Sequence, residues 1–310
     1  MTMARCNVCF RQCEIQEGEL GFCGARTCKD GIVIAGNYGI LTALNLDPIE
    51  KKPLRNFHPG SKILSVGSYG CNLRCPFCQN NSISWSDDIM AQAKEIANRD
   101  KTHSKGVLPQ ALVREAKAMK RMGNIGIAFT YNEPLVGYEY VRDTARLAHE
   151  AGLLNVMVTN GTASLAVLEE LAPYIDAMNI DLKGFTDEYY RNVLGGDRQM
   201  VMNFIAEAVK HCHVEITTLI IPGENDSDEE MRQLSRWIAG LQPKKESAHE
   251  DDSDQHSESE LSPGAQIPLH ISRFFPQFLM TDRGPTPVET IYHLADVARE
   301  NLQNVYTGNC

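Results

Sequence analysis

The stretch "ILSVGSYGCNLRCPFCQN", residues 63–80, joins a short apolar run to three cysteines that lie within eight residues. The run ILSVG is typical of a buried strand, and Cys71, Cys75 and Cys78 follow it in the spacing C-x3-C-x2-C. Structural zinc is closed by four protein ligands and iron–sulfur clusters prefer four thiolates, so three cysteines in one tight loop fit a cubane with one iron left unliganded. The alternative is three cysteines that are buried, or that bind zinc with a fourth ligand from elsewhere in the chain.

The same kind of strand recurs along the chain and alternates with helical patterns. Apolar or β-branched runs predict six strands, at residues 63–67, 126–130, 155–159, 177–181, 214–221 and 267–272. Apolar residues near helical spacing predict helices between them, at 109–123, 136–152, 163–174, 198–212 and 227–240. Strands separated by helices indicate a parallel sheet. Six units are too few for an eightfold barrel, so we expect an α/β fold with a partial, TIM-like (β/α)6 barrel.

Polar segments follow five of these strands. After the cysteines of the first strand come TYNEP (130–134), TNGT (159–162), DLKGF (181–185) and PGENDSD (222–228). Because parallel strands end at the same edge of a sheet, the loops that follow them meet there. The sequence therefore predicts one composite site built from five strand ends.

A second group of thiols precedes the barrel. The segment CNVCFRQCEIQEGELGFC contains Cys6, Cys9, Cys13 and Cys23, and Cys28 follows shortly after it. Four ligands at these spacings fit a closed site, either tetrahedral zinc or an auxiliary iron–sulfur cluster. The alternative is free cysteines in a small appendage. A module this short and poor in apolar residues is hard to fold without a metal, so we expect a metal site.

Composition narrows the classes of function. The chain has 310 residues, ten cysteines and a formal net charge of −10. The acidic charge disfavours a nucleic-acid binder, because phosphate contacts need clustered Lys and Arg. Ten cysteines in a long chain with no apolar leader point to metal or redox chemistry rather than to disulfides. No run approaches the roughly 18 apolar residues of a spanning helix, so we expect a soluble, cytoplasmic protein with no membrane contact.

The acidic charge is concentrated in one segment. Residues 243–264 hold seven acids against two lysines and almost no apolar residues. Such a segment cannot offset the entropy of folding, so we expect a disordered insertion, either a plain solvated loop or an acidic docking tether. We therefore divide the chain into a cysteine-rich metal-binding module with its lead-in (1–60), a core interrupted by this insertion (61–285), and a C-terminal helix and final strand (286–310).

The cysteine spacing, with Phe77 directly before Cys78, resembles the signature of the radical S-adenosylmethionine (SAM) superfamily. Residues 37–80, together with the runs AFTYNEP, NIDLKG, TTLIIPGENDS and HISRFFP, resemble the radical enzyme of the three-gene AmmeMemoRadiSam group. That group is similar to the pyruvate formate-lyase activating enzymes. The resemblance implies a partial (β/α)6 barrel of the radical SAM type, in agreement with the strand count.

The resemblance also implies a chemistry. Cys71, Cys75 and Cys78 would be the catalytic cysteines that hold a [4Fe-4S] cluster, with SAM bound at its fourth iron. Reductive cleavage of SAM would give methionine and a 5′-deoxyadenosyl radical that takes hydrogen from a substrate. Such an oxidoreductase needs an electron donor such as flavodoxin or ferredoxin, and its cofactors do the difficult chemistry while the protein orients them.

Two strand-end segments acquire roles from the same resemblance. Phe77 would pack near the adenine of SAM, Glu133 would accept from its methionyl ammonium, and Asn132 would add a polar contact. The alternative for Phe77 is an ordinary packing role, and the alternative for Glu133 is a surface acid in a proline-terminated turn.

The next two strand ends complete the predicted cofactor site. Asn160 would lie against the ribose, while Asp181 and Lys183 would face the methionyl and sulfonium end of SAM. The alternatives are ordinary turn chemistry at Asn160 and an exposed Asp–Lys pair, which contributes only about 0 to 1 kcal/mol.

The resemblance leaves the substrate open. Activating enzymes abstract hydrogen from a glycine of a partner enzyme, and this chain is expected to do so too, or else to modify a small molecule, nucleic acid or peptide together with the AmmeMemoRadiSam partner proteins. A hypothesis of another class is a non-catalytic, cysteine-rich zinc protein that binds RNA. The low basic content and the polar rim on five strand ends count against that hypothesis.

Overall fold

A single eight-stranded sheet forms the centre of the computed structural model, which describes residues 2–98, 106–244 and 262–310. In sheet order the strands are β12 (Val305–Gly308), β11 (Leu269–Arg273), β10 (His213–Ile220), β9 (Ala177–Asp181), β8 (Leu154–Thr159), β7 (Asn124–Phe129), β6 (Lys62–Gly67) and β5 (Ala43–Pro48). Neighbours from β6 to β12 are parallel, and β5 pairs antiparallel with β6. All six predicted strands are present, so the open α/β barrel is confirmed. Most of the acidic insertion lies outside the described residues.

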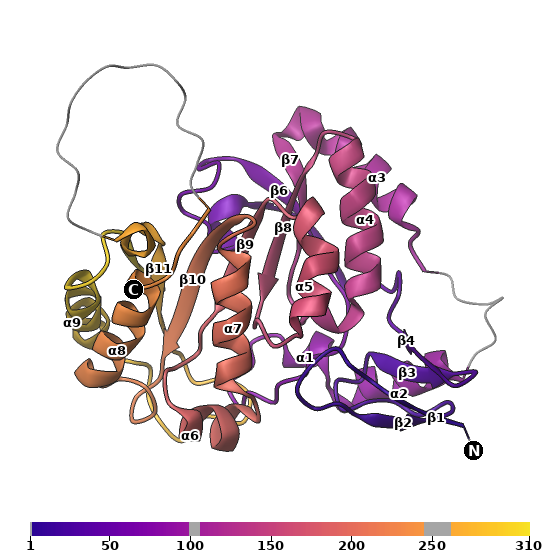
Figure 1. Cartoon of the computed structure of the whole chain (residues 1–310), viewed down its shortest axis with the longest axis horizontal. Coiled ribbons are helices and arrows are strands. Elements are labelled where there is room, and N and C mark those ends of the chain that lie inside the picture. Colours follow the sequence, from indigo (N-terminus) through magenta and orange to yellow (C-terminus); the bar gives the residue numbers. More distant parts are fainter. Residues whose placement is uncertain (1, 99–105, 245–261) are drawn as a thin grey trace.

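Helices connect the parallel strands as the apolar spacing predicts. The main ones are α3 (Pro109–Ala118), α4 (Tyr138–Glu150), α5 (Leu165–Leu171), α7 (Arg198–Ala208), α8 (Asp228–Ala239) and α9 (Val288–Arg299). Side-chain caps set two of their starts: Asp197 accepts from the Met200 amide and Ser227 from the Glu230 amide. Figure 1 shows α4, α5 and α7 side by side over one face of the sheet.

No helix in the described part of the chain combines the length and the apolar character that a membrane span requires. Three further helices complete the connections: α1 (Asn81–Ser84), α2 (Asp87–Ala97) and α6 (Asp187–Tyr189), the last continuing into a π-helical turn (Tyr190–Leu194). These segments follow β6 and β9, and they therefore lie near the strand ends where the predicted site is located.

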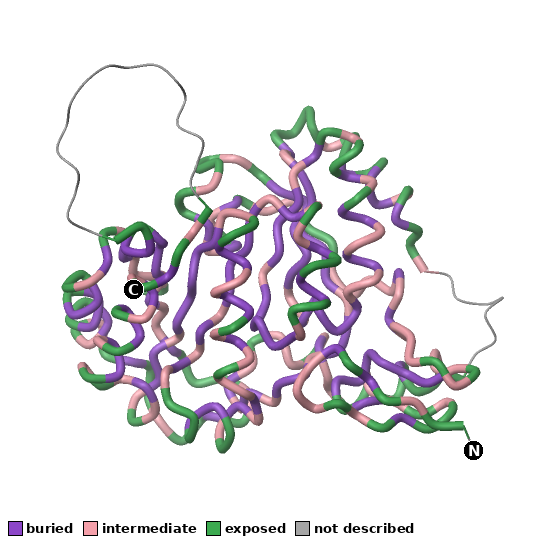
Figure 2. Tube along the Cα trace, in the orientation of Figure 1, coloured by how far each residue is buried: buried purple, intermediate pink, exposed green. Residues whose placement is uncertain are grey.

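The two faces of the sheet differ in polarity because successive strand residues point to opposite sides. On β10, Ile216 and Ile220 are fully buried in the main apolar core, whereas Thr217 and Leu219 between them line a cavity. Figure 2 shows the central strands buried over most of their length, with the exposed stretches on the helices and loops. One face of the sheet thus forms the core with the helices, and the other is left for the site.

A segment before β6 closes the amino-terminal end of the barrel. This strap, residues 49–57, begins with a 3-10 turn (Ile49–Lys51) and buries Ile49 and Leu54 completely. Both pack against residues at the starts of the strands, such as Ile63 and Ala177. Asn179 also donates to the Pro53 carbonyl at 2.8 Å. The strap therefore bounds the end of the cavity opposite the strand-end loops.

The cysteine-rich module consists of two short hairpins. They are β1 (Met3–Arg5) with β2 (Glu14–Gln16) and β3 (Arg26–Lys29) with β4 (Ile32–Ala35). Figure 1 places them, in indigo, at one end of the molecule. A salt bridge of 2.7 Å joins Arg26 to Glu139 on α4, and the Cys71 amide donates to the Cys23 carbonyl at 3.0 Å. The module therefore contacts the cysteine loop of the barrel directly.

Candidate active site

One cavity brings the predicted catalytic and cofactor-binding residues together. It has a volume of about 930 Å³. Its lining includes all nine of them, namely Cys71, Cys75, Phe77, Cys78, Asn132, Glu133, Asn160, Asp181 and Lys183. They come from the segments that follow β6, β7 and β8 and from the end of β9. The common strand edge therefore assembles these residues, which lie more than a hundred positions apart in the sequence.

The cysteine loop is held in place by backbone and arginine contacts. Within the loop, the Cys78 amide donates to the Cys75 carbonyl at 3.2 Å. The Arg74 amide donates to the Leu194 carbonyl at 3.1 Å, and the Arg74 guanidinium donates to the Cys71 carbonyl at 2.7 Å. Because these bonds satisfy backbone groups of the loop, the three thiols can face the cavity.

The donor set fits a cubane cluster with one open position. Burial raises the pKa of Cys71 and Cys78 and raises that of Cys75 to about 11. Because burial disfavours the charged form, these cysteines can be thiolates only if a cation beside them stabilises the negative charge. No fourth cysteine is among the described residues that line this cavity. Three thiolates with space beside them match a [4Fe-4S] cluster that leaves one iron for another ligand.

Glu133 is a buried acceptor that ties two strand ends together, and not a surface acid. Only 3% of it is exposed. Its carboxylate accepts from Thr159 Oγ1 at 2.6 Å and from the backbone amides of Asn160 and Leu135 at 2.7 and 3.0 Å. Burial raises its pKa to about 7 against these hydrogen bonds. A carboxylate has about four acceptor positions, so one remains for a ligand.

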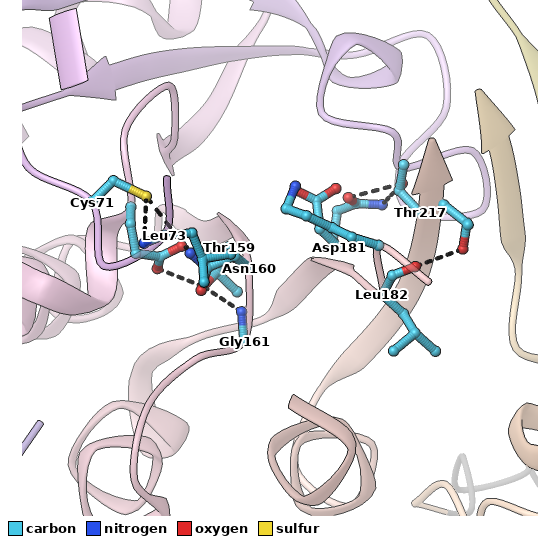
Figure 3. A network of polar contacts seen from close by, with 12 residues as sticks. Cys71, Leu73, Thr159, Asn160, Gly161, Asp181, Leu182 and Thr217 are labelled. Atoms are coloured by element: carbon cyan, nitrogen blue, oxygen red, sulfur yellow. Dashed lines mark hydrogen bonds and ion pairs between the residues drawn. The ribbon is translucent and has the colours of Figure 1, made fainter. Parts of the chain in front are cut away.

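The two asparagines support the cysteine loop. Asn132 Oδ1 accepts from the Ser68 amide at 2.9 Å, and its Nδ2 donates to the carbonyls of Tyr69 and Gly70 at 3.1 and 3.2 Å. Asn160 Nδ2 lies 3.8 Å from Cys71 Sγ and 3.0 Å from Asn72 Oδ1. Figure 3 shows Asn160 reaching toward Cys71 from the end of β8. The sequence predicted both residues as cofactor contacts and missed this support of the loop.

Asp181 and Lys183 form an ion pair in the cavity. Lys183 Nζ lies 2.8 Å from Asp181 Oδ2, with 17% and 31% of the two side chains exposed. Burial lowers the pKa of Lys183, but Asp181 and the nearby Cys75 outweigh burial and raise it. Asn225, from the predicted loop after β10, donates to the Lys183 carbonyl at 2.8 Å. The pair is therefore a positioned, mostly buried feature and not an exposed surface pair.

The cavity also has a wall that the strand-end pattern missed. Its members include Arg55 of the strap, His270 of β11 and Tyr306 of β12. The alternation of polar residues in the predicted strand LHIS was the available signal for His270 and Ser272. Arg55 and Tyr306 stand in segments with no such pattern.

The four N-terminal cysteines predicted as ligands line a second, smaller cavity. Cys6, Cys9, Cys13 and Cys23 share it with Asn72, the residue next to Cys71. Burial raises the pKa of Cys23 to about 11. Across residues 2–98, 106–244 and 262–310, no three Cys, His, Asp or Glu side chains are arranged to hold a metal ion as they stand. The metal of this N-terminal cysteine site therefore remains a prediction, and so do Cys71, Cys75 and Cys78 as cluster ligands.

Comparison with known proteins identifies the class. The radical SAM superfamily model matches residues 65–235. An uncharacterized protein of Methanocaldococcus jannaschii is 38% identical over 307 residues, which are 98% of this chain and 81% of that protein. Pyruvate formate-lyase 1-activating enzyme of Escherichia coli is 26% identical over 186 residues, which are 59% of this chain and 70% of that enzyme.

A solved structure shows the same fold. Streptococcus suis SuiB bound to S-adenosylmethionine superposes with a TM-score of 0.52 at 14% identity, over 80% of this chain and 52% of that one. The chain belongs to the radical SAM superfamily, as the cysteine spacing predicted. Its cofactors are accordingly a [4Fe-4S] cluster and SAM.

Proposed function

We propose that Cys71, Cys75 and Cys78 hold the [4Fe-4S] cluster and that SAM lies in the cavity beside them. The observation that carries this proposal is the convergence of nine predicted residues on one cavity. The chemistry supplied by the bound cofactors is the one-electron reductive cleavage of SAM to methionine and a 5′-deoxyadenosyl radical, which takes a hydrogen atom from the substrate. An external one-electron donor, such as flavodoxin or ferredoxin, supplies the electron.

The chain's own residues bind and orient the cofactor in this proposal. The free acceptor position of Glu133 receives the methionyl ammonium, and Lys183, held by Asp181, faces the methionyl carboxylate. Phe77, which is 5% exposed and lines the cavity, packs against the adenine. Asn160, whose Nδ2 lies 3.8 Å from Cys71 Sγ, would contact the ribose.

The substrate has two candidates. The first candidate, a glycine of a partner enzyme, is supported by the similarity to pyruvate formate-lyase activating enzymes at 26–28% identity. We also propose that the chain is a member of the AmmeMemoRadiSam group. The second candidate is a small molecule, which would lie in the part of the cavity lined by Arg55, His270 and Tyr306, away from the cysteine loop.

Anaerobic reconstitution with iron, sulfide, SAM and a strong reductant tests the chemistry. Mass spectrometry is expected to find 5′-deoxyadenosine with the wild type. Cys71→Ala, Cys75→Ala and Cys78→Ala are each expected to lose both the cluster absorbance and this product, because a cubane with two protein thiolates is poorly held. Cys310→Ala, which alters an exposed cysteine outside the cavity lining, is the matched control. Cleavage that persists in any of the three variants would sink the assignment.

A further inference from the structure

At the strap end of the cavity, three side chains from distant segments form a continuous wall. The Tyr306 ring lies 5.4 Å from the His270 ring, and the Arg55 guanidinium lies 5.7 Å from the Tyr306 ring. All three line the cavity that also holds the cysteine loop. Neither the predicted cluster site nor the predicted SAM site uses them. We call Arg55, His270 and Tyr306 the strap-side wall.

The fully buried carboxylate of Glu215 organises this wall. It accepts from the backbone amides of Arg55 and Asn56 at 2.9 and 2.7 Å, and from Nε2 of His213 and His270 at 2.9 and 2.6 Å. Burial raises its pKa, but these hydrogen bonds outweigh burial and lower the pKa to about 2. The ionised carboxylate can only accept, so both imidazoles donate to it through Nε2–H.

The His270 and Tyr306 side chains and the backbone of Arg55 are therefore fixed before any ligand arrives, while the Arg55 side chain is exposed. Glu215 holds the His270 ring and the backbone that carries Arg55, and the Tyr306 hydroxyl donates to Asn56 Oδ1 at 2.7 Å. The His270 ring binds Glu215 through Nε2, so its Nδ1 is the polar atom left for a ligand. Preorganised groups of this kind bind a ligand at a lower cost in conformational entropy.

The charge of the wall indicates the kind of ligand. The other cavity cations have carboxylate partners: Lys51 with Asp47 (3.5 Å), Lys183 with Asp181 (2.8 Å) and Arg299 with Asp296 (2.6 Å). For Arg55, the described part of the chain shows no carboxylate partner. Glu50, which also lines the cavity, accepts from the Gly60 amide at 2.6 Å. Arg55 is therefore an exposed cation at the cavity that no carboxylate side chain of the described residues pairs with.

We propose that the strap-side wall binds an anionic group, phosphate or carboxylate, of a small polar substrate. Arg55 is the counter-ion, since a guanidinium pairs with either group through two parallel hydrogen bonds. His270 and Tyr306 add polar contacts beside it. The inference rests on the proposed function, because the rest of the substrate then lies between the wall and the cofactor end of the cavity.

Equilibrium dialysis of the reconstituted holoenzyme with labelled inorganic phosphate and labelled malonate tests this site. The wild type is expected to bind at least one probe, and Arg55→Ala to bind it about ten-fold more weakly. Arg55→Lys keeps the positive charge but lacks the planar guanidinium with its two parallel donors. Its affinity for the probe is expected to lie between those of the wild type and Arg55→Ala. Arg146→Ala is the matched control, because Arg146 pairs with Glu150 on the outside of α4, and it is expected to bind as the wild type does.

The two probes distinguish the sources of the anion. Tighter phosphate binding supports a phosphorylated substrate, and tighter malonate binding supports a carboxylated one. Equal affinities of wild type and Arg55→Ala, or no binding of either probe to the wild type, overturn the inference. SAM binding measured on the same samples separates the two proposals: a wild type that fails to bind SAM contradicts the proposed function, whereas SAM binding with Arg55-independent probe affinity contradicts only the strap-side wall.

Discussion

Lys183→Met removes a buried positive charge from the cofactor end of the cavity while keeping the length of the side chain. In the wild type, Lys183 Nζ is 2.8 Å from Asp181 Oδ2 and 17% of the side chain is exposed. A charge-assisted hydrogen bond from this ammonium to the carboxylate of SAM contributes roughly 1.5–3 kcal/mol. Because Asp181 already shares the ammonium, the lower end of that range applies.

The expected loss of SAM affinity is therefore about ten-fold, which corresponds to about 1.4 kcal/mol. The measurement is a calorimetric titration of reconstituted, unreduced protein with SAM. Iron content and the visible spectrum of the cluster are expected to stay at wild-type values, because Lys183 is not a cluster ligand in the proposed site. Asp181→Asn is expected to weaken SAM binding similarly, because Lys183 then loses the carboxylate that orients it.

Arg146→Met is the matched control for this experiment. Arg146 also forms an ion pair of 2.8 Å, with Glu150, but 48% and 56% of the two side chains are exposed. Such surface pairs contribute about 0 to 1 kcal/mol, and the residue is absent from the cavity lining. Its variant is expected to bind SAM as the wild type does. Wild-type SAM affinity in Lys183→Met, with an intact cluster, would refute the assigned role and leave the cysteine loop as the secure part of the site.

Two further predictions concern the second cysteine group and the strap. In a variant with Cys71, Cys75 and Cys78 all changed to Ala, metal analysis is expected to find about one remaining metal site at the N-terminal cysteine site; a metal-free protein would contradict this. Glu215→Gln is expected to lower the free energy of unfolding by about 3 kcal/mol, because hydrogen bonds hold the Glu215 pKa at about 2 instead of 4.5. The measurement is urea unfolding of Glu215→Gln and of Glu207→Gln, a partly exposed control. Equal losses of unfolding free energy in the two variants would show that Glu215 does not hold the strap.

The stability contribution of Glu215 has a definite pH dependence. The pKa of Glu215 is lower in the folded state, about 2, than in the unfolded state, about 4.5. Its contribution to stability is therefore complete above about pH 4.5 and disappears as the pH falls toward about 2. The difference in unfolding free energy between wild type and Glu215→Gln is therefore expected to narrow across that interval.

Local patterns in the sequence were sufficient for the class of fold and for naming residues that the structure brings into one cavity. Six apolar runs predicted six strands of the sheet, and the spacing of Cys71, Cys75 and Cys78 predicted an open cubane. The rule that parallel strands share one edge then brought the motifs after β7, β8 and β9 to the same cavity as the cysteines, whereas no residue of the fifth predicted segment, 222–228, is in its lining. The strands could be predicted because periodicity and strand direction are properties of short segments, while the three cysteines as cluster ligands stay a prediction.

The strap-side wall and the exact use of each polar group depended on the tertiary structure. Nothing near Arg55 in the sequence indicates that its backbone amide meets Glu215, 160 positions later, or that Tyr306 donates to Asn56, 250 positions earlier. The antiparallel strand β5 was likewise missed, because its exposed residues lack a buried-strand pattern. Such contacts arise from strand register and from the need to satisfy buried polar groups. Both are decided only when the whole sheet has formed, so the sequence determined the cofactor end of the cavity and the tertiary structure alone determined the wall proposed to face the substrate.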